Sequence, residues 1–128
     1  MKLSEFIRKL EQVIPKGWAL PDDPVGLHLG DPEQEIQTVM AGLEASTDLL
    51  HETREKQAQL LFVHHPLLYR PLKRVVQSDP VQRLVRELIK NDIALYAAHT
   101  NMDAHPQGMA KRWAEKLGCK TVEPVTQI

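Results

Sequence analysis

The side chains with the clearest chemical potential in this sequence stand in two short groups. His64 and His65 are adjacent and precede Pro66, and a second group runs from His99 to Asp103. Neutral imidazole nitrogens and carboxylate oxygens together form ligand sets that suit zinc, iron or manganese. We therefore predict that His64, His65 and Asp103 bind metal. His99 is either a further ligand or a neighbour that orients Asp103.

The two adjacent histidines face a geometrical restriction. Successive residues of a regular strand point to opposite faces, so His64 and His65 could not share one ion inside a strand. Beyond the strand end, with Pro66 fixing the turn, they could serve two neighbouring ions that Asp103 bridges through its two oxygens. Paired ions of this kind activate a water and stabilise both ends of a displacement. A histidine pair alone is more often a surface or packing feature, so the prediction depends on the second group.

A basic segment follows the histidine pair closely. Arg70, Lys73 and Arg74 could hold a phosphorylated substrate beside the metal ions. The alternative is that they are the solvated side chains of a loop. Three other histidines lack a comparable context and are predicted to be packing or surface residues, with only the last a weak candidate ligand: His28, His51 and His105.

Alternating helices and strands must position these groups. Apolar spacing predicts helices over about 4–14, 46–57, 80–89 and 109–117, the first three with caps at Ser4, at Ser46 or Thr47, and at Asp79. Apolar runs predict a buried strand over 36–43 and further strands over 60–63 and 93–98. Prolines and glycines predict a loop over 18–35. In the last helix we expect Trp113 and Leu117 to pack against the rest of the protein.

This order of elements predicts an α/β fold with a mostly parallel sheet and helices packed on it. In such sheets the functional groups gather beyond the carboxyl ends of the strands. The second predicted strand runs directly into His64, and the third runs directly into His99. The two groups of candidate ligands should therefore meet at one edge of the sheet.

Composition limits the classes of protein that this chain can belong to. Its 128 residues suffice for one domain, 1–128, and 42% apolar with 26% charged residues is typical of a globular chain. Sixteen basic and seventeen acidic residues leave no field that would attract nucleic acid or an anionic membrane. Cys119 is the single cysteine, so no intrachain disulfide can form, and we expect it to be a partly buried structural thiol. With no signal-like or membrane-spanning apolar run, we expect a cytoplasmic protein without a membrane partner.

Three segments resemble the Nif-three-like family, whose members are called GTP cyclohydrolase 1 type 2. Residues 61–68, LFVHHPLL, resemble the family motif ITHHPL, and residues 93–105, IALYAAHTNMDAH, resemble IAVYAAHTNLDA. Residues 23–30, DPVGLHLG, are a weaker match to DNVGLQVG. The three segments follow the family's order, and the resemblance extends over essentially the whole chain.

The resemblance implies an α/β fold with a dinuclear metal centre. By position, His64 and His65 would be ligands of the two ions, Asp103 would bridge them, and His99 would lie in or against this shell. It also implies toroidal homo-oligomers, often hexamers. GTP cyclohydrolase activity is attached to some members, which implies a small phosphorylated or nucleotide substrate, and interaction or regulatory roles are proposed for others.

Several departures from the family pattern leave more than one reading open. Family members are about twice this length or longer, so this chain corresponds to their N-terminal half. Their C-terminal half supplies a histidine and, four residues on, a glutamate that complete the site. No such pair follows Asp103 here, and Pro24, His28 and Glu44 replace the family's asparagine, glutamine and aspartate. The chain is then a metal-dependent hydrolase whose missing ligands come from elsewhere, or a non-catalytic metal-binding, oligomerisation or regulatory module. An unrelated two-metal phosphoesterase is a distant third reading.

Overall fold

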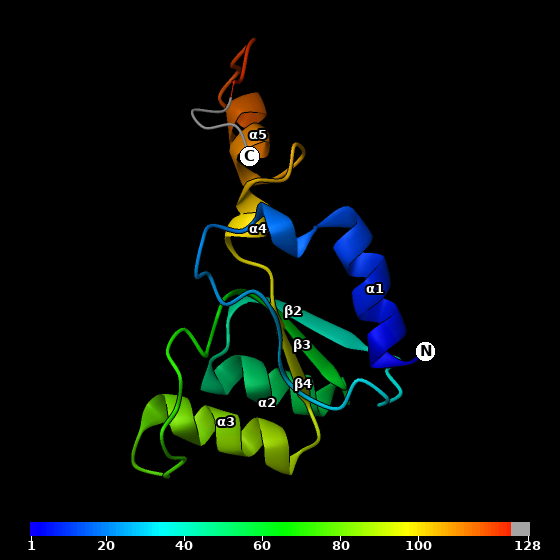
Figure 1. Ribbon diagram of the computed structural model, residues 1–128, viewed down its shortest axis with the longest axis vertical. Helices are drawn as coiled ribbons and strands as arrows, with labels where there is room; N and C mark the ends of the chain where they lie inside the picture. Colours follow the sequence, from blue (N-terminus) through cyan, green and yellow to red (C-terminus); the bar gives the residue numbers. More distant parts are fainter. Residues whose placement is uncertain (124–128) are drawn as a thin grey trace.

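The computed structural model describes residues 1–123 and contains one four-stranded sheet (Figure 1). The elements are α1 (Leu3–Val13), the 3-10 helix η1 (Lys16–Trp18), β1 (Gly26–Leu29), β2 (Val39–Glu44), α2 (Thr47–Glu55), β3 (Leu60–His65), α3 (Pro80–Lys90), β4 (Ala94–Ala97), α4 (Thr100–Asp103) and α5 (Met109–Lys116). The strands lie side by side in the order β1-β4-β3-β2.

The sheet confirms the predicted α/β class, and it is mixed. Strands β2, β3 and β4 are parallel, while β1 pairs antiparallel with β4. The β1 strand lies in the segment 18–35 that the sequence predicts to be a loop. Its register starts with Gly26 opposite Ala97 and shifts between Leu27 and Leu29. The sheet therefore has one antiparallel edge that its local sequence does not reveal.

Helices cover the two faces of the sheet unequally. On one face, α2 and α3 pack against a core that includes Leu61, Val63 and Leu95. On the other face, α1 covers a second core that includes Leu60 and Tyr96. Figure 1 shows α2 and α3 together below the strands and α1 at the other side. Because side chains alternate along β3 and β4, these two strands contribute to both cores and are the centre of the fold.

Local capping chemistry sets the starts of two helices as predicted. The Ser46 hydroxyl accepts the Leu49 N–H at 3.1 Å at the start of α2. The Asp79 carboxylate accepts the Gln82 N–H at 2.9 Å at the start of α3, with Pro80 in the first turn. Helix α1, by contrast, begins at Leu3, so the predicted cap residue Ser4 lies inside the helix. Lys2, which precedes the helix, makes no side-chain cap bond.

Several predicted boundaries are corrected by the structure. Strand β2 begins at Val39 instead of residue 36, and it is a largely exposed edge strand rather than a buried one. Strand β3 continues through His65 instead of ending at Val63. The reason is the pairing of β3 with β2, which extends to the last residue of both strands, where Glu44 lies opposite His65.

The C-terminal helix α5 differs most from its predicted packing. It projects beyond the sheet in Figure 1, and none of its residues is buried. Trp113 is 58% exposed and Leu117 is 75% exposed, so the expectation that they pack against the protein is wrong. Cys119 is likewise exposed rather than partly buried. Among residues 1–123, no helix combines the length and the apolar character needed to cross a membrane.

Candidate metal centre

The carboxyl ends of the three parallel strands bring the predicted ligands together. Glu44 ends β2, His64 and His65 end β3, and His99 follows β4 by two residues. The His64 ring lies 5.2 Å from the His65 ring and 5.2 Å from the His99 ring between centroids, and the remaining pair is 6.0 Å apart. Asp103, the last residue of α4, lies one helical turn after His99. The expected convergence at one sheet edge is thus present.

His64 is fixed in one tautomer by the backbone. Its Nδ1 atom donates a hydrogen bond to the carbonyl oxygen of Ala98 at 2.9 Å, since that oxygen can only accept. In the neutral ring the proton therefore resides on Nδ1, and Nε2 carries the lone pair. This Nε2 atom lies 3.6 Å from Oδ1 of Asp103, and the His64 side chain is only 14% exposed.

His65 faces an acidic residue that sequence reasoning did not select. Its Nδ1 atom lies 3.6 Å from Oε2 of Glu44, at the end of the neighbouring strand. The parallel pairing of β2 with β3 sets these two residues opposite each other. The signal in the sequence was the acidic residue at the end of the first predicted strand, where the related family has aspartate.

His99 is held by Asp23, which sequence reasoning also missed. Asp23 lies in the loop before β1, its side chain is 5% exposed, and its Oδ1 accepts the His99 Nδ1 proton at 2.9 Å. Its other oxygen accepts the Thr100 N–H at 3.1 Å and the Thr100 hydroxyl proton. His99 is predicted to be either a ligand or a neighbour that orients Asp103. Within residues 1–123, no side-chain hydrogen bond joins His99 to Asp103, so the orienting role has no support. The Nε2 atom of His99 remains available as a ligand.

The pKa of Asp23 records this environment. Burial by itself would raise the pKa of the carboxyl group, because it penalises the charged form. The hydrogen bonds from Thr100 and His99 outweigh burial, and the pKa of Asp23 lies below its ordinary value. Asp23 is therefore an ionised acceptor at neutral pH, which fixes the proton of His99 on Nδ1.

The donor atoms fit metal ions as two pairs rather than as one closed cage. Two ligands of a tetrahedral zinc ion, each about 2.1 Å from it, are about 3.4 Å apart. The 3.6 Å separations of His64 from Asp103 and of His65 from Glu44 are close to this value. In residues 1–123, no group of three or more His, Cys, Asp or Glu side chains could hold an ion as they stand. Either pair could hold an ion only together with further ligands.

The remaining predicted residues do not join this cluster. Arg70, Lys73 and Arg74 are exposed in the segment between β3 and α3, and Arg74 lines a small hollow at the start of α3 together with Asp79. Within residues 1–123, no hydrogen bond or ion pair links the three basic side chains to the histidines.

The other three histidines lie in packing or surface positions. His28 donates from Nε2 to the Pro24 carbonyl oxygen at 2.6 Å. His51 lies on the exposed face of α2, and the His105 ring packs 5.8 Å from the Trp18 ring.

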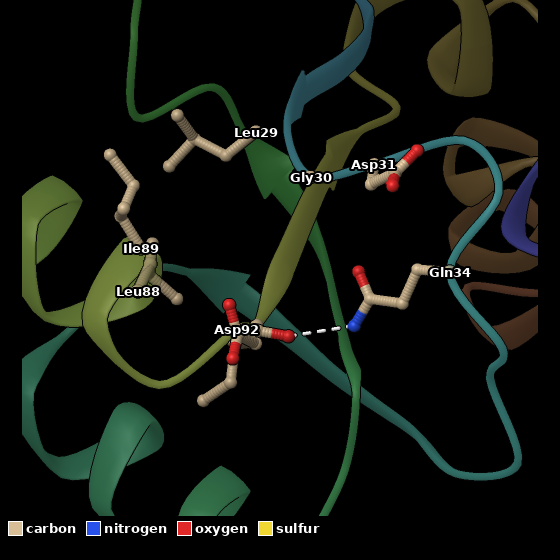
Figure 2. A pocket seen from close by; sticks show the side chains of 8 residues that line it. Leu29, Gly30, Asp31, Gln34, Leu88, Ile89 and Asp92 are labelled. Atoms are coloured by element: carbon tan, nitrogen blue, oxygen red, sulfur yellow. Dashed lines mark hydrogen bonds between the residues drawn. The ribbon is translucent and has the colours of Figure 1, made fainter.

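Two hollows in the surface differ in their relation to the candidate ligands. A groove of about 840 Å³ runs between η1, α4 and α5, and Thr100, Asp103 and Lys111 line it. A smaller pocket of about 310 Å³ lies beside the amino end of β4, at the sheet edge opposite the histidines. Figure 2 shows its lining, where the Gln34 side chain donates to the Asp92 carbonyl oxygen. Of these two hollows, the groove is the one that reaches Asp103.

Comparisons with known proteins identify relatives over most of the chain. A family model described as Duf34/NIF3 (NGG1p interacting factor 3) matches residues 1–128. The "GTP cyclohydrolase 1 type 2 homolog" of Bacillus subtilis (strain 168) is 36% identical over 119 residues, which cover 93% of this chain and 32% of that protein.

Solved structures show the same fold. A Bacillus cereus protein related to NIF3 matches with a TM-score of 0.87 and 33% identity, over 92% of this chain and 33% of that one. Reduced HcgD from Methanocaldococcus jannaschii matches with a TM-score of 0.82 and 34% identity, over 90% of this chain and 46% of that one. The chain spans about a third of the length of the Bacillus proteins it matches. The match over its full length shows that it belongs to the Duf34/NIF3 family.

Proposed function

We propose that this chain binds divalent metal ions at the carboxyl ends of β2, β3 and β4, as part of a metal-dependent hydrolase of the GTP cyclohydrolase 1 type 2 kind. One observation carries the proposal: the Nδ1 proton of His64 is held by the Ala98 carbonyl oxygen, while Nε2 faces Asp103 at 3.6 Å. Metal-ligating histidines are oriented in this way, with one ring nitrogen bonded to a carbonyl and the other free for the ion.

The two donor pairs would hold two ions. His64 and Asp103 would contribute to one ion, and His65 and Glu44 would contribute to the other. The second oxygen of Asp103 would be available as a bridge, and Nε2 of His99 as a further donor. Imidazole and carboxylate ligands suit zinc, iron and manganese alike, and all three are candidates. Since no three-donor group in residues 1–123 could hold an ion as it stands, the proposed site takes further ligands from outside these residues.

The residues around these pairs would position a substrate. A bound divalent ion would supply Lewis acidity at this edge of the sheet. The groove beside Asp103 is large enough for a small phosphorylated or nucleotide substrate, and Lys111 in its wall could attract a phosphate. Arg70, Lys73 and Arg74 could contact the same substrate only if the exposed loop that carries them moved towards the histidines.

A non-catalytic metal-binding or regulatory module is the second candidate. The observation that favours it is the absence, in residues 1–123, of a three-donor group able to hold an ion. A chain with an incomplete site binds metal weakly and contributes through contacts rather than turnover. A cytoplasmic location belongs to both candidates, because an unpaired exposed cysteine fits a reducing compartment.

Metal binding by the purified chain tests the proposal. The chain is loaded with zinc or manganese, dialysed, and its metal content is measured by mass spectrometry. We expect His64→Ala to lower the metal content, while His51→Ala, which changes an exposed histidine of α2, should leave it unchanged. Equal effects of the two substitutions, or no metal after loading, would contradict the proposed metal binding and with it the enzyme. Turnover of GTP by the loaded chain would favour the enzyme, and metal content without turnover would favour the module.

A further inference from the structure

A small pocket lies at the end of the sheet away from the candidate metal ligands. Its volume is about 310 Å³, and it is lined by residues from the end of β1, from the turn that follows β1, and from the end of α3. Ile93 in its lining immediately precedes β4, whereas the candidate ligands lie at the carboxyl ends of the parallel strands. The proposed metal binding therefore makes no use of this pocket.

The lining of this pocket is divided into an apolar and a polar side. Figure 2 shows Leu29, Leu88 and Ile89 together on one side, and Asp31 and Gln34 on the other. Leu88 is 1% exposed and Ile89 is 56% exposed, so the apolar side extends from the core of the protein to its surface. A ligand that fills the pocket must therefore join an apolar body to a polar group.

The polar side consists mainly of hydrogen-bond acceptors. Asp31 and Asp92 carry carboxylates, which only accept when they are ionised. The Gln34 Nε2 group donates to the Asp92 carbonyl oxygen at 2.7 Å, which leaves the amide oxygen of Gln34 as a further acceptor. Among residues 1–123, no lysine, arginine or histidine lines the pocket. The ligand must therefore supply hydrogen-bond donors, and positive charge on it is favoured.

Nearby basic residues do not neutralise the two carboxylates within the pocket. Lys2 pairs with Glu33 at 2.5 Å. Lys90, in the last turn of α3, is exposed and does not line the pocket. The negative charge on the polar side is therefore available to a ligand.

Helix α3 ends at the pocket and adds a second source of negative potential. It has 11 residues, Pro80–Lys90, and the aligned peptide dipoles of a helix place partial negative charge at its carboxyl end. Leu88 and Ile89 of its last turn line the pocket, and so does Asp92, two residues beyond its end. The preference for a cation thus has a backbone origin as well as a side-chain origin.

The folded chain fixes the shape of the polar side. Gly30 has a φ of +121°, and a Cβ there would lie 2.6 Å from Cβ of Ala94, so glycine allows the turn to lie directly against β4. The Asp31 carbonyl oxygen accepts the Gln34 N–H at 2.9 Å, and the Gln34 side chain then reaches Asp92. A ligand meets acceptors that are already in position, which lowers the entropic cost of binding.

We propose that this pocket binds a small primary aliphatic amine in its protonated form. The alkyl chain lies against Leu29, Leu88 and Ile89, and the ammonium group donates to the polar side, where Asp31 and Asp92 supply opposite charge. An ammonium group has three donors and no acceptor, which matches a side made mainly of acceptors. The volume of about 310 Å³ is at the lower end of the range for small-ligand pockets, about 300–1,000 Å³, and favours a short chain.

Binding of 1-pentylamine to the full chain, followed in ¹H–¹⁵N correlation spectra, tests the proposal. Burial of its alkyl chain supports a dissociation constant of about 1 mM, with saturable shifts of the Gly30, Gln34 and Asp92 amides. Pentan-1-ol and pentanoate have the same chain length without positive charge and should bind about tenfold more weakly or less. Equal affinities for the three, no saturable shift up to about 20 mM, or shifts confined to other residues would overturn the proposal.

The double substitution Asp31→Asn and Asp92→Asn removes the charge and keeps the shape of the pocket. Asparagine can still accept the Glu33 N–H that Asp31 accepts at 2.9 Å, and it tolerates the φ of 53° at residue 92. We expect the affinity for 1-pentylamine to fall about tenfold and that for pentan-1-ol to stay the same. The matched control is Asp22→Asn, at an exposed residue with a φ of 63°, which should leave both affinities unchanged. Equal affinity of the double variant and the control for 1-pentylamine would contradict the proposal.

A lysine side chain of another protein carries the same ammonium group, and a model compound distinguishes this source from a free amine. In Nα-acetyl-lysine amide the alkyl chain ends in a bulky peptide unit, so it should bind more weakly than 1-pentylamine in a pocket of this size. Tighter binding of the lysine compound would overturn the assignment to a free amine and would indicate a protein partner instead.

Discussion

Replacing the buried carboxylate of Asp23 by an amide tests the hydrogen bonds that fix His99. In Asp23→Asn the amide oxygen can keep the two bonds from Thr100, which the present Oδ2 accepts. The amide NH₂ group then faces the Nδ1 proton of His99, where the present Oδ1 accepts at 2.9 Å. Two donors cannot bond, so the proton of His99 moves to Nε2 or the ring turns away.

The size of the effect follows from the kind of bond that is lost. A hydrogen bond to a charged group contributes about 1.5–3 kcal/mol, and the Asp23 side chain is 5% exposed, so solvent replaces little of it. For a domain of this size, 1 kcal/mol corresponds to about 4 °C, which gives a fall in melting temperature of about 6–12 °C. Loss of a group that orients a metal-ligating histidine typically lowers metal affinity by about 10–100-fold.

Three measurements on the same variant separate the possible outcomes. Thermal unfolding with a chelator present gives the stability, zinc titration calorimetry gives the affinity, and long-range ¹H–¹⁵N correlation spectra give the tautomer of His99. The control is Asp22→Asn, at an exposed neighbour whose positive φ of 63° asparagine tolerates, and it should change stability by less than about 0.5 kcal/mol. An unchanged tautomer together with an unchanged melting temperature in Asp23→Asn would refute the assigned role.

Three further outcomes are expected. Since the pKa of Asp23 is lowered in the folded chain, its stabilisation is complete above the ordinary carboxyl pKa of about 4 and is lost as the pH falls through the folded value. The difference in unfolding free energy between wild type and Asp23→Asn should therefore shrink below about pH 4 in urea titrations, and a growing difference would contradict this sign. Ser46→Ala removes the cap of α2 and should cost about 1 kcal/mol by urea unfolding. Gly30→Ala should cost about 1–3 kcal/mol, because φ is +121° and the new Cβ would lie 2.6 Å from Cβ of Ala94, whereas Gly17→Ala, with open space around it, should change little.

Features of the fold that depend on nearby residues could be predicted from the sequence. Ser46 and Asp79 cap helices through residues three positions ahead, so a short window contains the whole interaction. Strand β1 could not be predicted in this way, because Gly26–Leu29 is short and its pairing partner lies about 70 positions later in β4. Periodicity likewise marks the apolar face of α5 but does not state whether anything covers Trp113.

The residues of the candidate site differ in the same way, since some could be predicted from nearby sequence and others could not. His64 and His99 could be predicted to converge because each follows an apolar run, and parallel strands bring such ends together. Asp23 could not be assigned, since 76 positions separate it from His99 and it lies in a loop whose path no local pattern fixes. Glu44 was visible as a departure from the family's aspartate, but only the register of β2 with β3 shows that it faces His65.

The candidate ligands His64 and Asp103 lie on elements of unequal stability, and this difference should affect the kinetics of metal exchange at the proposed site. His64 is attached to β3, which is bonded on both sides and whose amide protons should exchange with solvent as slowly as any in the chain. Asp103 belongs to a four-residue helix, and its side chain is 48% exposed. Opening of α4 alone would release the carboxylate while the imidazole stays in place. A metal ion should therefore enter and leave through the Asp103 side, at a rate set by local opening of α4 rather than by unfolding of the sheet.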